Sequence, residues 1–186
     1  ADDVAFAVDV AATHFYDEQT GEYHLETDGV SLDRAGMIQR LLEWVERYPI
    51  VSIEDPLFED DWEGWRTLAD RLDGVQLLGD DFLVTDRERL DRAIDAEAAT
   101  AVLVKMNQAG TITRTIDVME RAMDAGLSTV VSARSGETCD STMADLAVAY
   151  GAGQLKVGSL ARSERLAKYN RLFEIENERD PTLSTF

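Results

Sequence analysis

Short apolar runs alternate with amphipathic helical stretches six times along this chain of 186 residues. This alternation limits the possible folds more than any other feature, because it predicts a parallel α/β sheet. The apolar runs, each typical of a strand buried on both faces of such a sheet, are residues 4–8, 50–53, 75–78, 101–104, 129–131 and 155–157. The helical patterns occupy residues 31–48, 61–72, 86–96, 111–125, 140–150 and 162–177.

Several local signals refine these elements. The helix over 31–48 has Ser31 as a candidate N-cap, and the helix over 111–125 stops at Gly126. The apolar face of the first of these helices is expected to hold Met37, Leu41, Trp44, Val45 and Tyr48. Residues 16–30 break the alternation and indicate a turn with short flanking strands.

The regular repeat favours a TIM-type (β/α) barrel over an open sheet. A complete (β/α)₈ barrel needs eight strands and about 250 residues, so six units are too few. We therefore expect residues 1–186 to form one barrel domain that is the C-terminal part of something larger, or whose missing strands come from another chain.

Composition excludes several classes of partner. The chain has 37 acidic and 18 basic residues, a net charge of −19, which argues against nucleic-acid binding because phosphate backbones require a basic surface. No apolar run reaches the roughly 18 residues of a membrane span, and no signal peptide is visible. The single cysteine, Cys139, excludes an internal disulfide and fits a reducing, cytoplasmic location.

Carboxylates follow the first three predicted strands at matching positions. Asp9, Glu54 and Asp80 each come directly after or near the end of an apolar run. In a parallel barrel these strand ends meet at one mouth, where like charges repel unless a cation joins them. Oxygen ligands suit Mg²⁺, so these three residues are the predicted metal ligands. Any one carboxylate taken alone, such as Asp55 or Asp81, is equally consistent with a helix cap or a solvated loop.

Cationic residues follow the later strands. The chain has 18 basic residues but only three lysines, and Lys105 and Lys156 both lie in or beside apolar strands. A lysine near a metal can act as a general base, because its pKa can be lowered, whereas an arginine stays charged. The segment from Arg134 through Ser135 to Gly136 offers a guanidinium and a hydroxyl suited to a phosphate. Together these groups suit abstraction of a proton next to a carboxylate.

The motifs that carry these residues resemble the enolase family. They extend in order over essentially the whole chain and include Val8-Asp9-Val10-Ala11-Ala12, Ser52-Ile53-Glu54-Asp55-Pro56, Gly79-Asp80-Asp81 with Val84-Thr85, Lys105-Met106-Asn107-Gln108, Arg134-Ser135-Gly136-Glu137-Thr138, Gly153-Gln154-Leu155-Lys156 and the segment Arg162–Asn170. The resemblance is to the C-terminal barrel portion, and the family's N-terminal capping domain and first barrel strands are not in these residues.

The resemblance implies a Mg²⁺-dependent lyase that interconverts 2-phosphoglycerate and phosphoenolpyruvate in glycolysis, usually as a homodimer or larger homo-oligomer. Asp9, Glu54 and Asp80 would bind Mg²⁺, which also holds the substrate carboxylate. Lys105 would remove the α-proton. Lys156 would help to neutralise the carboxylate and the intermediate. Arg134 and Ser135 would bind the phosphate, and Gln108 and Asp81 would support these groups.

One departure from the family keeps other functions open. Ala133 stands where the family has a histidine that contacts the substrate, so a hydrogen-bond donor is lost and space is opened. An enolase paralogue acting on a phosphonate analogue, like the one that makes carboxyphosphonoenolpyruvate in antibiotic biosynthesis, is the first alternative. A non-catalytic enolase-like binding protein is the second, although such a protein has no need for lysines in its strands.

Overall fold

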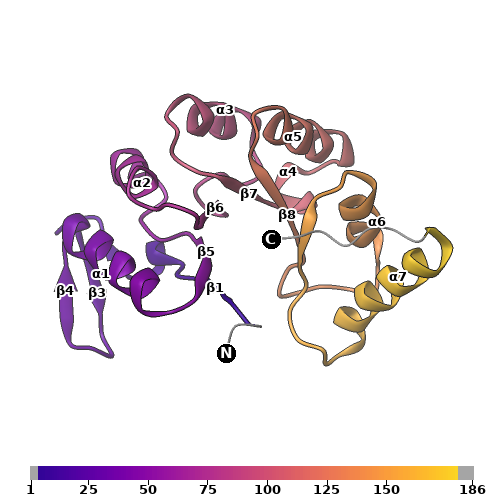
Figure 1. Cartoon of the computed structure of the whole chain (residues 1–186), viewed down its shortest axis with the longest axis horizontal. Coiled ribbons are helices and arrows are strands. Elements are labelled where there is room, and N and C mark those ends of the chain that lie inside the picture. The colour runs from indigo at the N-terminus through magenta and orange to yellow at the C-terminus, as the bar shows by residue number, and fades with distance from the viewer. Residues whose placement is uncertain (1–3, 180–186) are drawn as a thin grey trace. The chain divides into compact units, whose positions relative to one another are not determined.

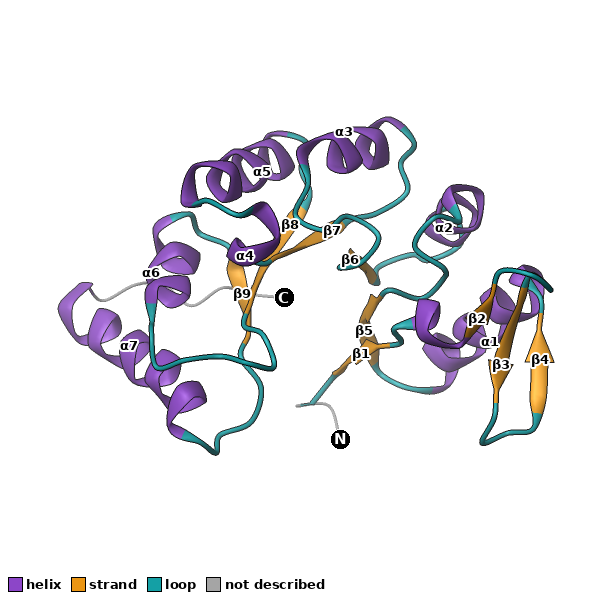
Figure 2. Ribbon diagram, turned by 180° about the vertical axis from the view of Figure 1, so that it is seen from behind, coloured by secondary structure: helices purple, strands orange, loops and turns teal. Residues whose placement is uncertain are grey.

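The computed structural model describes residues 4–179, which divide into two compact units (Figure 1). Unit 1 contains residues 4–83 and 88–101, and unit 2 contains residues 84–87 and 102–179 of the described chain. Within each unit the helices lie along one face of the strands (Figure 2). The predicted α/β class is confirmed in both units.

Unit 1 is built on three strands whose order follows the chain, and the pairs β1/β5 and β5/β6 are parallel. Its strands and helices are β1 (Phe6–Asp9), β5 (Ile50–Glu54), β6 (Gln76–Gly79), α1 (Arg34–Arg47), α2 (Trp62–Ala69) and α3 (Arg87–Asp95). Met37, Ile38 and Leu41 form the buried face of α1, while Tyr48, expected on that face, is 44% exposed. Tyr48 follows the last helical residue in extended backbone, which turns its ring away from the apolar face.

The irregular segment before α1 folds into a second, antiparallel sheet. The segment begins with the short helix η1 (Ala12–Phe15). The sheet is formed by β2 (Tyr16–Asp17), β3 (Glu22–Leu25) and β4 (Val30–Leu32). The predicted turn and flanking strands are confirmed, and β4 is an addition. Ser31 pairs with His24 inside β4, so the prediction that Ser31 caps α1 is wrong. The N-cap is Asp33, whose carboxylate accepts a hydrogen bond from the Gly36 N–H at 2.8 Å.

Unit 2 repeats the strand and helix alternation. Its elements are β7 (Ala101–Val104), β8 (Ser128–Ser132), β9 (Gly153–Lys156), α4 (Met106–Ala109), α5 (Ile112–Asp124), α6 (Thr142–Ala149) and α7 (Ser163–Arg179). Strands β8 and β9 are parallel, and Gly126 ends the α5 turn with a positive φ of 80°, as predicted. Among residues 4–179, no helix is both long and apolar enough to cross a bilayer.

Two of the six predicted strands are less buried than expected. Strand β7 matches its predicted range and is buried throughout, whereas β1 and β9 are largely exposed. In the described part of the chain each of these two strands has a hydrogen-bonded neighbour on one side. Burial on both faces is therefore not found for β1 and β9 within residues 4–179.

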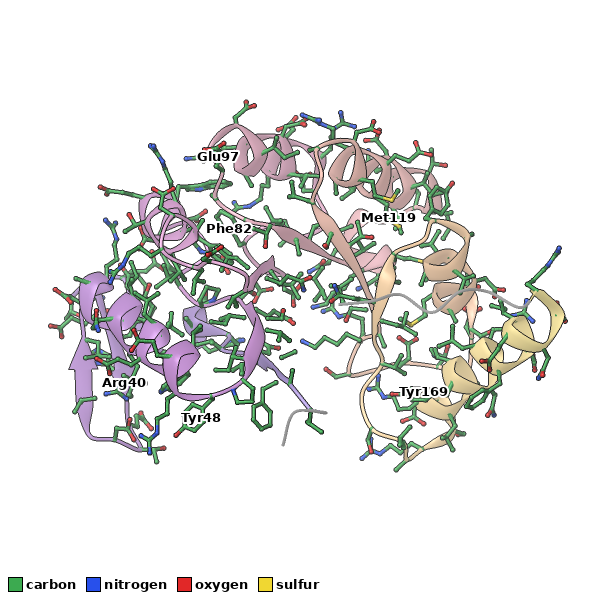
Figure 3. All side chains as sticks on the ribbon, in the orientation of Figure 1. Arg40, Tyr48, Phe82, Glu97, Met119 and Tyr169 are labelled. Carbon is green, nitrogen blue, oxygen red and sulfur yellow. The ribbon has the colours of Figure 1, made fainter. Side chains whose placement is uncertain are left out.

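Aromatic packing fixes the loop that follows β6. The Phe82 ring, labelled in Figure 3, stacks on Trp65 of α2 with a centroid distance of 3.9 Å. Both side chains are fully buried, as is Leu83 beside them. A Cβ added to Gly79 would lie 2.7 Å from Leu83 Cγ, so a residue without a side chain is required at the end of β6. The turn from Gly79 to Leu83 is thereby held against the core.

We predict that Gly79→Ala destabilises the fold. The new methyl group would push Leu83 out of place, at a cost of about 1–3 kcal/mol in the free energy of unfolding. Gly136→Ala is the matched control, because no atom lies within 4 Å of its added Cβ. Urea unfolding followed by tryptophan fluorescence measures both, and equal effects of the two substitutions would contradict this packing account.

Candidate active site

The three predicted metal ligands lie at neighbouring strand ends of unit 1. Asp9 and Glu54 are register partners at the carboxyl ends of β1 and β5. Asp80 follows β6 directly, two residues after Leu78, the register partner of Glu54. Glu54 and Asp80 are only 5% and 8% exposed, while Asp9 is exposed on its edge strand. The topology therefore brings the three carboxylates to the end of this sheet where the carboxyl ends of its strands lie.

Asp55 anchors the loop that carries Asp80. Its Oδ1 accepts a hydrogen bond from the Asp80 N–H at 2.9 Å, and its Oδ2 accepts one from the Asp81 N–H at 2.8 Å. Burial raises the pKa of Asp55 to about 7, although these two bonds act in the opposite direction. Asp55 also has a positive φ of 42°, which is a strained backbone conformation for a residue other than glycine. In this conformation its carboxylate reaches the amides of the loop that follows β6.

Carboxylate oxygens of Asp55, Asp80 and Asp81 lie within 4.8 Å of one another. Asp80 belongs both to this group and to the predicted ligand set. The carboxylate of Asp55 is already engaged by two amides, which suits it to holding the loop. The possible metal ligands at these strand ends are all carboxylate oxygens, and those of Glu54 and Asp80 belong to buried residues. This combination fits a hard divalent cation such as Mg²⁺.

Arg89 of α3 joins the loops that follow β5 and β6. Its guanidinium donates to the Phe82 carbonyl at 2.6 Å and to the Glu59 carbonyl at 2.7 Å, and pairs with Asp60 at 3.1 Å. Burial, followed by the charge of Asp81, raises the pKa of Glu59. These loops thus concentrate negative charge, and one arginine sets their spacing. Sequence reasoning missed Arg89, because a helical arginine carries no signal of what it contacts.

Lys105, the predicted base, follows β7 in unit 2 and is half-buried. Its backbone N–H donates to the Thr85 hydroxyl at 2.9 Å. Thr85 is 2% exposed, and its hydroxyl also lies 2.9 Å from Gln108 Oε1. Val84 and Thr85 both have positive φ, which costs a β-branched residue about 1–3 kcal/mol. This strained pair holds the start of the Lys105 segment.

Lys156 is the last residue of β9 and is exposed within residues 4–179, where a buried strand was expected. Lys156 is the register partner of Ser132, and its carbonyl accepts a hydrogen bond from the Ala133 N–H at 2.9 Å. The backbone at Ala133 is therefore fixed beside Lys156, although Ala133 itself offers no polar side chain.

The predicted phosphate-binding residues line a pocket of about 470 Å³ in unit 2. Arg134 and Ser135 follow β8, and the Arg134 guanidinium lies 3.5 Å from Asn107 Oδ1. The complete lining is Met106, Asn107, Ser132, Arg134, Ser135, Gly136, Glu137, Asp140 and Met143. An exposed guanidinium and a hydroxyl at a pocket of this size suit a small anion.

The lysine that the fold buries completely is Lys168 of α7, which sequence reasoning did not select. The available signal was its place among three lysines in an arginine-rich chain. The predicted groups are thus described in two sets, with carboxylates in unit 1 and cations in unit 2. That all of them serve one site stays a prediction.

Comparison with known proteins gives one family. A family model described as "Enolase, C-terminal TIM barrel domain" matches residues 1–183. The enolase of Methanococcus maripaludis is 51% identical over 177 residues, which is 95% of this chain and 41% of that protein. The chain therefore spans less than half the length of this curated relative.

We predict that Asp55→Ala lowers the free energy of unfolding by about 1–3 kcal/mol, because the amides of Asp80 and Asp81 lose their acceptors. Asp73→Ala, at an exposed position, serves as the control and should change stability by less than about 0.5 kcal/mol. Urea unfolding measures both variants. An Asp55→Ala protein as stable as the control would show that the two hydrogen bonds do not hold the loop.

Proposed function

This chain belongs to the enolase C-terminal TIM barrel family, and from that premise we propose that its protein is a Mg²⁺-dependent lyase that interconverts 2-phosphoglycerate and phosphoenolpyruvate. The observation that carries the proposal is the 51% identity to an enolase over 95% of the chain. Carboxylates at the strand ends of unit 1 and cations at those of unit 2 support it. The proposal includes the cytoplasmic location and homo-oligomeric state that the resemblance implies.

The carboxylates of unit 1 have the proposed role of holding the metal. Asp9, Glu54 and Asp80 would bind Mg²⁺, and Asp55 would keep the Asp80 loop in place. When bound, Mg²⁺ supplies positive charge next to the substrate carboxylate and so acidifies the neighbouring C–H. Burial of Glu54 and Asp80 strengthens their attraction for a cation, since little water competes.

The cations of unit 2 have the proposed roles of base and anion clamp. The Lys105 Nζ takes the α-proton, and the Thr85 hydroxyl fixes the backbone from which that side chain extends. Arg134 and Ser135 hold the phosphate from the pocket after β8. Lys156 places a second ammonium at the end of the adjacent strand, where it offsets the negative charge of the substrate.

We predict that Lys105→Ala and Lys105→Arg in the intact protein both reduce exchange of the substrate α-proton with D₂O by at least about 100-fold. Arginine keeps the charge but cannot act as a base, so it separates the two roles of the lysine. Exchange is followed by NMR and Mg²⁺ affinity by calorimetry. Mg²⁺ binding should persist in both variants, and retained exchange would remove Lys105 from its proposed role.

A second candidate function comes from Ala133, which stands where the family has a histidine and whose backbone N–H donates to the Lys156 carbonyl. The space it leaves favours a paralogue that acts on a phosphonate analogue. We expect the intact protein to turn over 2-phosphoglycerate faster than a phosphonate three-carbon acid. The measurement is the ratio of kcat/KM for the two compounds, and a ratio that favours the phosphonate would replace the leading proposal. If neither reacts while Mg²⁺ binds, a non-catalytic binding protein is the better interpretation.

A further inference from the structure

The buried lysine of α7 contacts three acceptors. The Lys168 side chain is 0% exposed, and its Nζ lies 2.9 Å from the Glu164 carbonyl and 3.5 Å from Glu137 Oε1. A short hydrogen bond to the Thr138 carbonyl completes the set. An ammonium group has three N–H donors, so each donor has one acceptor here. Two of the three acceptors belong to the loop that follows β8.

The Glu137 carboxylate organises that loop from within. Its Oε2 accepts a hydrogen bond from the Arg134 N–H at 3.1 Å, and its Oε1 accepts one from the Thr138 N–H at 3.1 Å. Burial raises the pKa of Glu137, but the two amides and Lys168 together outweigh burial and lower it. The carboxylate is therefore charged at neutral pH. It binds the backbone amides at both ends of the segment from Arg134 to Thr138, which contains Arg134 and Ser135.

Two more side chains of α7 hold the neighbouring backbone. The Arg165 guanidinium donates to the Val157 carbonyl at 2.9 Å and to the Ser135 carbonyl at 3.2 Å. The hydroxyl of Tyr169, labelled in Figure 3, donates to the Gly158 carbonyl at 2.9 Å. Helix α7 thus fixes the loops after both β8 and β9, and its contacts with the first of them are to Ser135, Glu137 and Thr138, which follow Arg134.

Stability alone does not account for an ion pair in this place. A buried pair contributes little over apolar packing of the same volume, because both ions lose their hydration. What an apolar pair cannot do is direct the backbone amides of Arg134 and Thr138. Arginine could not replace Lys168 easily, since a planar fork does not fit around three converging acceptors at a side chain that is 0% exposed.

We propose that Lys168 and Glu137 are positioning residues that hold the Arg134–Ser135 loop in the conformation that binds the phosphate of the substrate. The inference rests on the proposed function, which assigns Arg134 and Ser135 to that phosphate. Lys168 does not touch the substrate in this account, and Glu137, although it lines the pocket, has both carboxylate oxygens engaged by the amides of Arg134 and Thr138. They act through the backbone of the loop, so their loss should weaken phosphate binding and leave metal binding intact.

The test uses the intact protein with Lys168→Met and Glu137→Gln, which remove either charge at similar volume. Inorganic phosphate is the probe, titrated by calorimetry and as a competitive inhibitor. We expect its affinity to fall on the order of tenfold or more in each variant, since a displacement of about 1 Å can cost about 100-fold. KM for 2-phosphoglycerate should rise by the same factor while Mg²⁺ affinity stays unchanged. The double variant should be little worse than either single one, because both charges act as one pair.

Arg171→Met is the matched control on the same helix. Arg171 pairs with Asp145 of α6 at 2.7 Å and with Glu174 of α7 at 2.9 Å, not with the loop after β8. It should leave phosphate affinity at the wild-type value. An equal loss of phosphate affinity in this variant would show that any weakening of α7 has the same effect, and would overturn the proposal.

Three other results would decide the question. If Lys168→Met does not fold, the near-isosteric Glu137→Gln carries the test, and a folded Glu137→Gln protein with wild-type phosphate affinity overturns the inference. A wild-type protein that binds no phosphate also overturns it. A wild-type protein that binds phosphate but turns over neither substrate refutes the proposed function alone, because the titration still shows whether the pair sets the affinity of the loop.

Discussion

Glu54 and Asp80 are carboxylates that the fold removes from water at the ends of two adjacent parallel strands, with Asp9 in register beside Glu54. Like charges in such a position repel one another and lose hydration, which favours the cation that we propose there. Other residues of unit 1 hold the segments that carry these carboxylates. Gly79 lets the chain turn tightly after β6, and the Asp55 carboxylate holds that turn by accepting a hydrogen bond from the Asp80 N–H.

Both units fix their loops with buried and half-buried polar groups. In unit 1, Asp55 and Arg89 bind backbone amides and carbonyls of the loops after β5 and β6. In unit 2, the Thr85 hydroxyl and the Lys168–Glu137 pair do the same for the segments that carry Lys105 and Arg134. A loop held by hydrogen bonds to its backbone leaves its own side chains available for a ligand. This is the property that a binding loop on a strand end requires.

The sequence predicted the strands well because short apolar runs that alternate with helical stretches are typical of a parallel sheet, and β7 falls within its predicted bounds. It placed the cap of α1 at Ser31 in place of Asp33, since two capping residues so close together have similar signals. Contacts that join distant segments, such as those of Arg89 and Lys168, depend on the fold and leave no local pattern.

The candidate site divides in the same way. Residues at strand ends were predictable, because the topology of a parallel sheet alone brings Asp9, Glu54 and Asp80 to one edge. The residues that support the candidate site were not predictable. Asp55 holds the Asp80 loop and Thr85 holds the Lys105 segment, and both do so from backbone conformations that sequence does not reveal. Both have positive φ, which is rare for residues other than glycine and recurs here beside proposed functional groups.

The most direct test of the account is a crystal structure of the intact protein with Mn²⁺ in place of Mg²⁺, located by its anomalous scattering. The account predicts one ion bound by carboxylate oxygens of Asp9, Glu54 and Asp80, with the ammonium groups of Lys105 and Lys156 directed toward the same space. An ion held by Asp55 and Asp81 without Glu54, or lysines directed into bulk solvent, would contradict it.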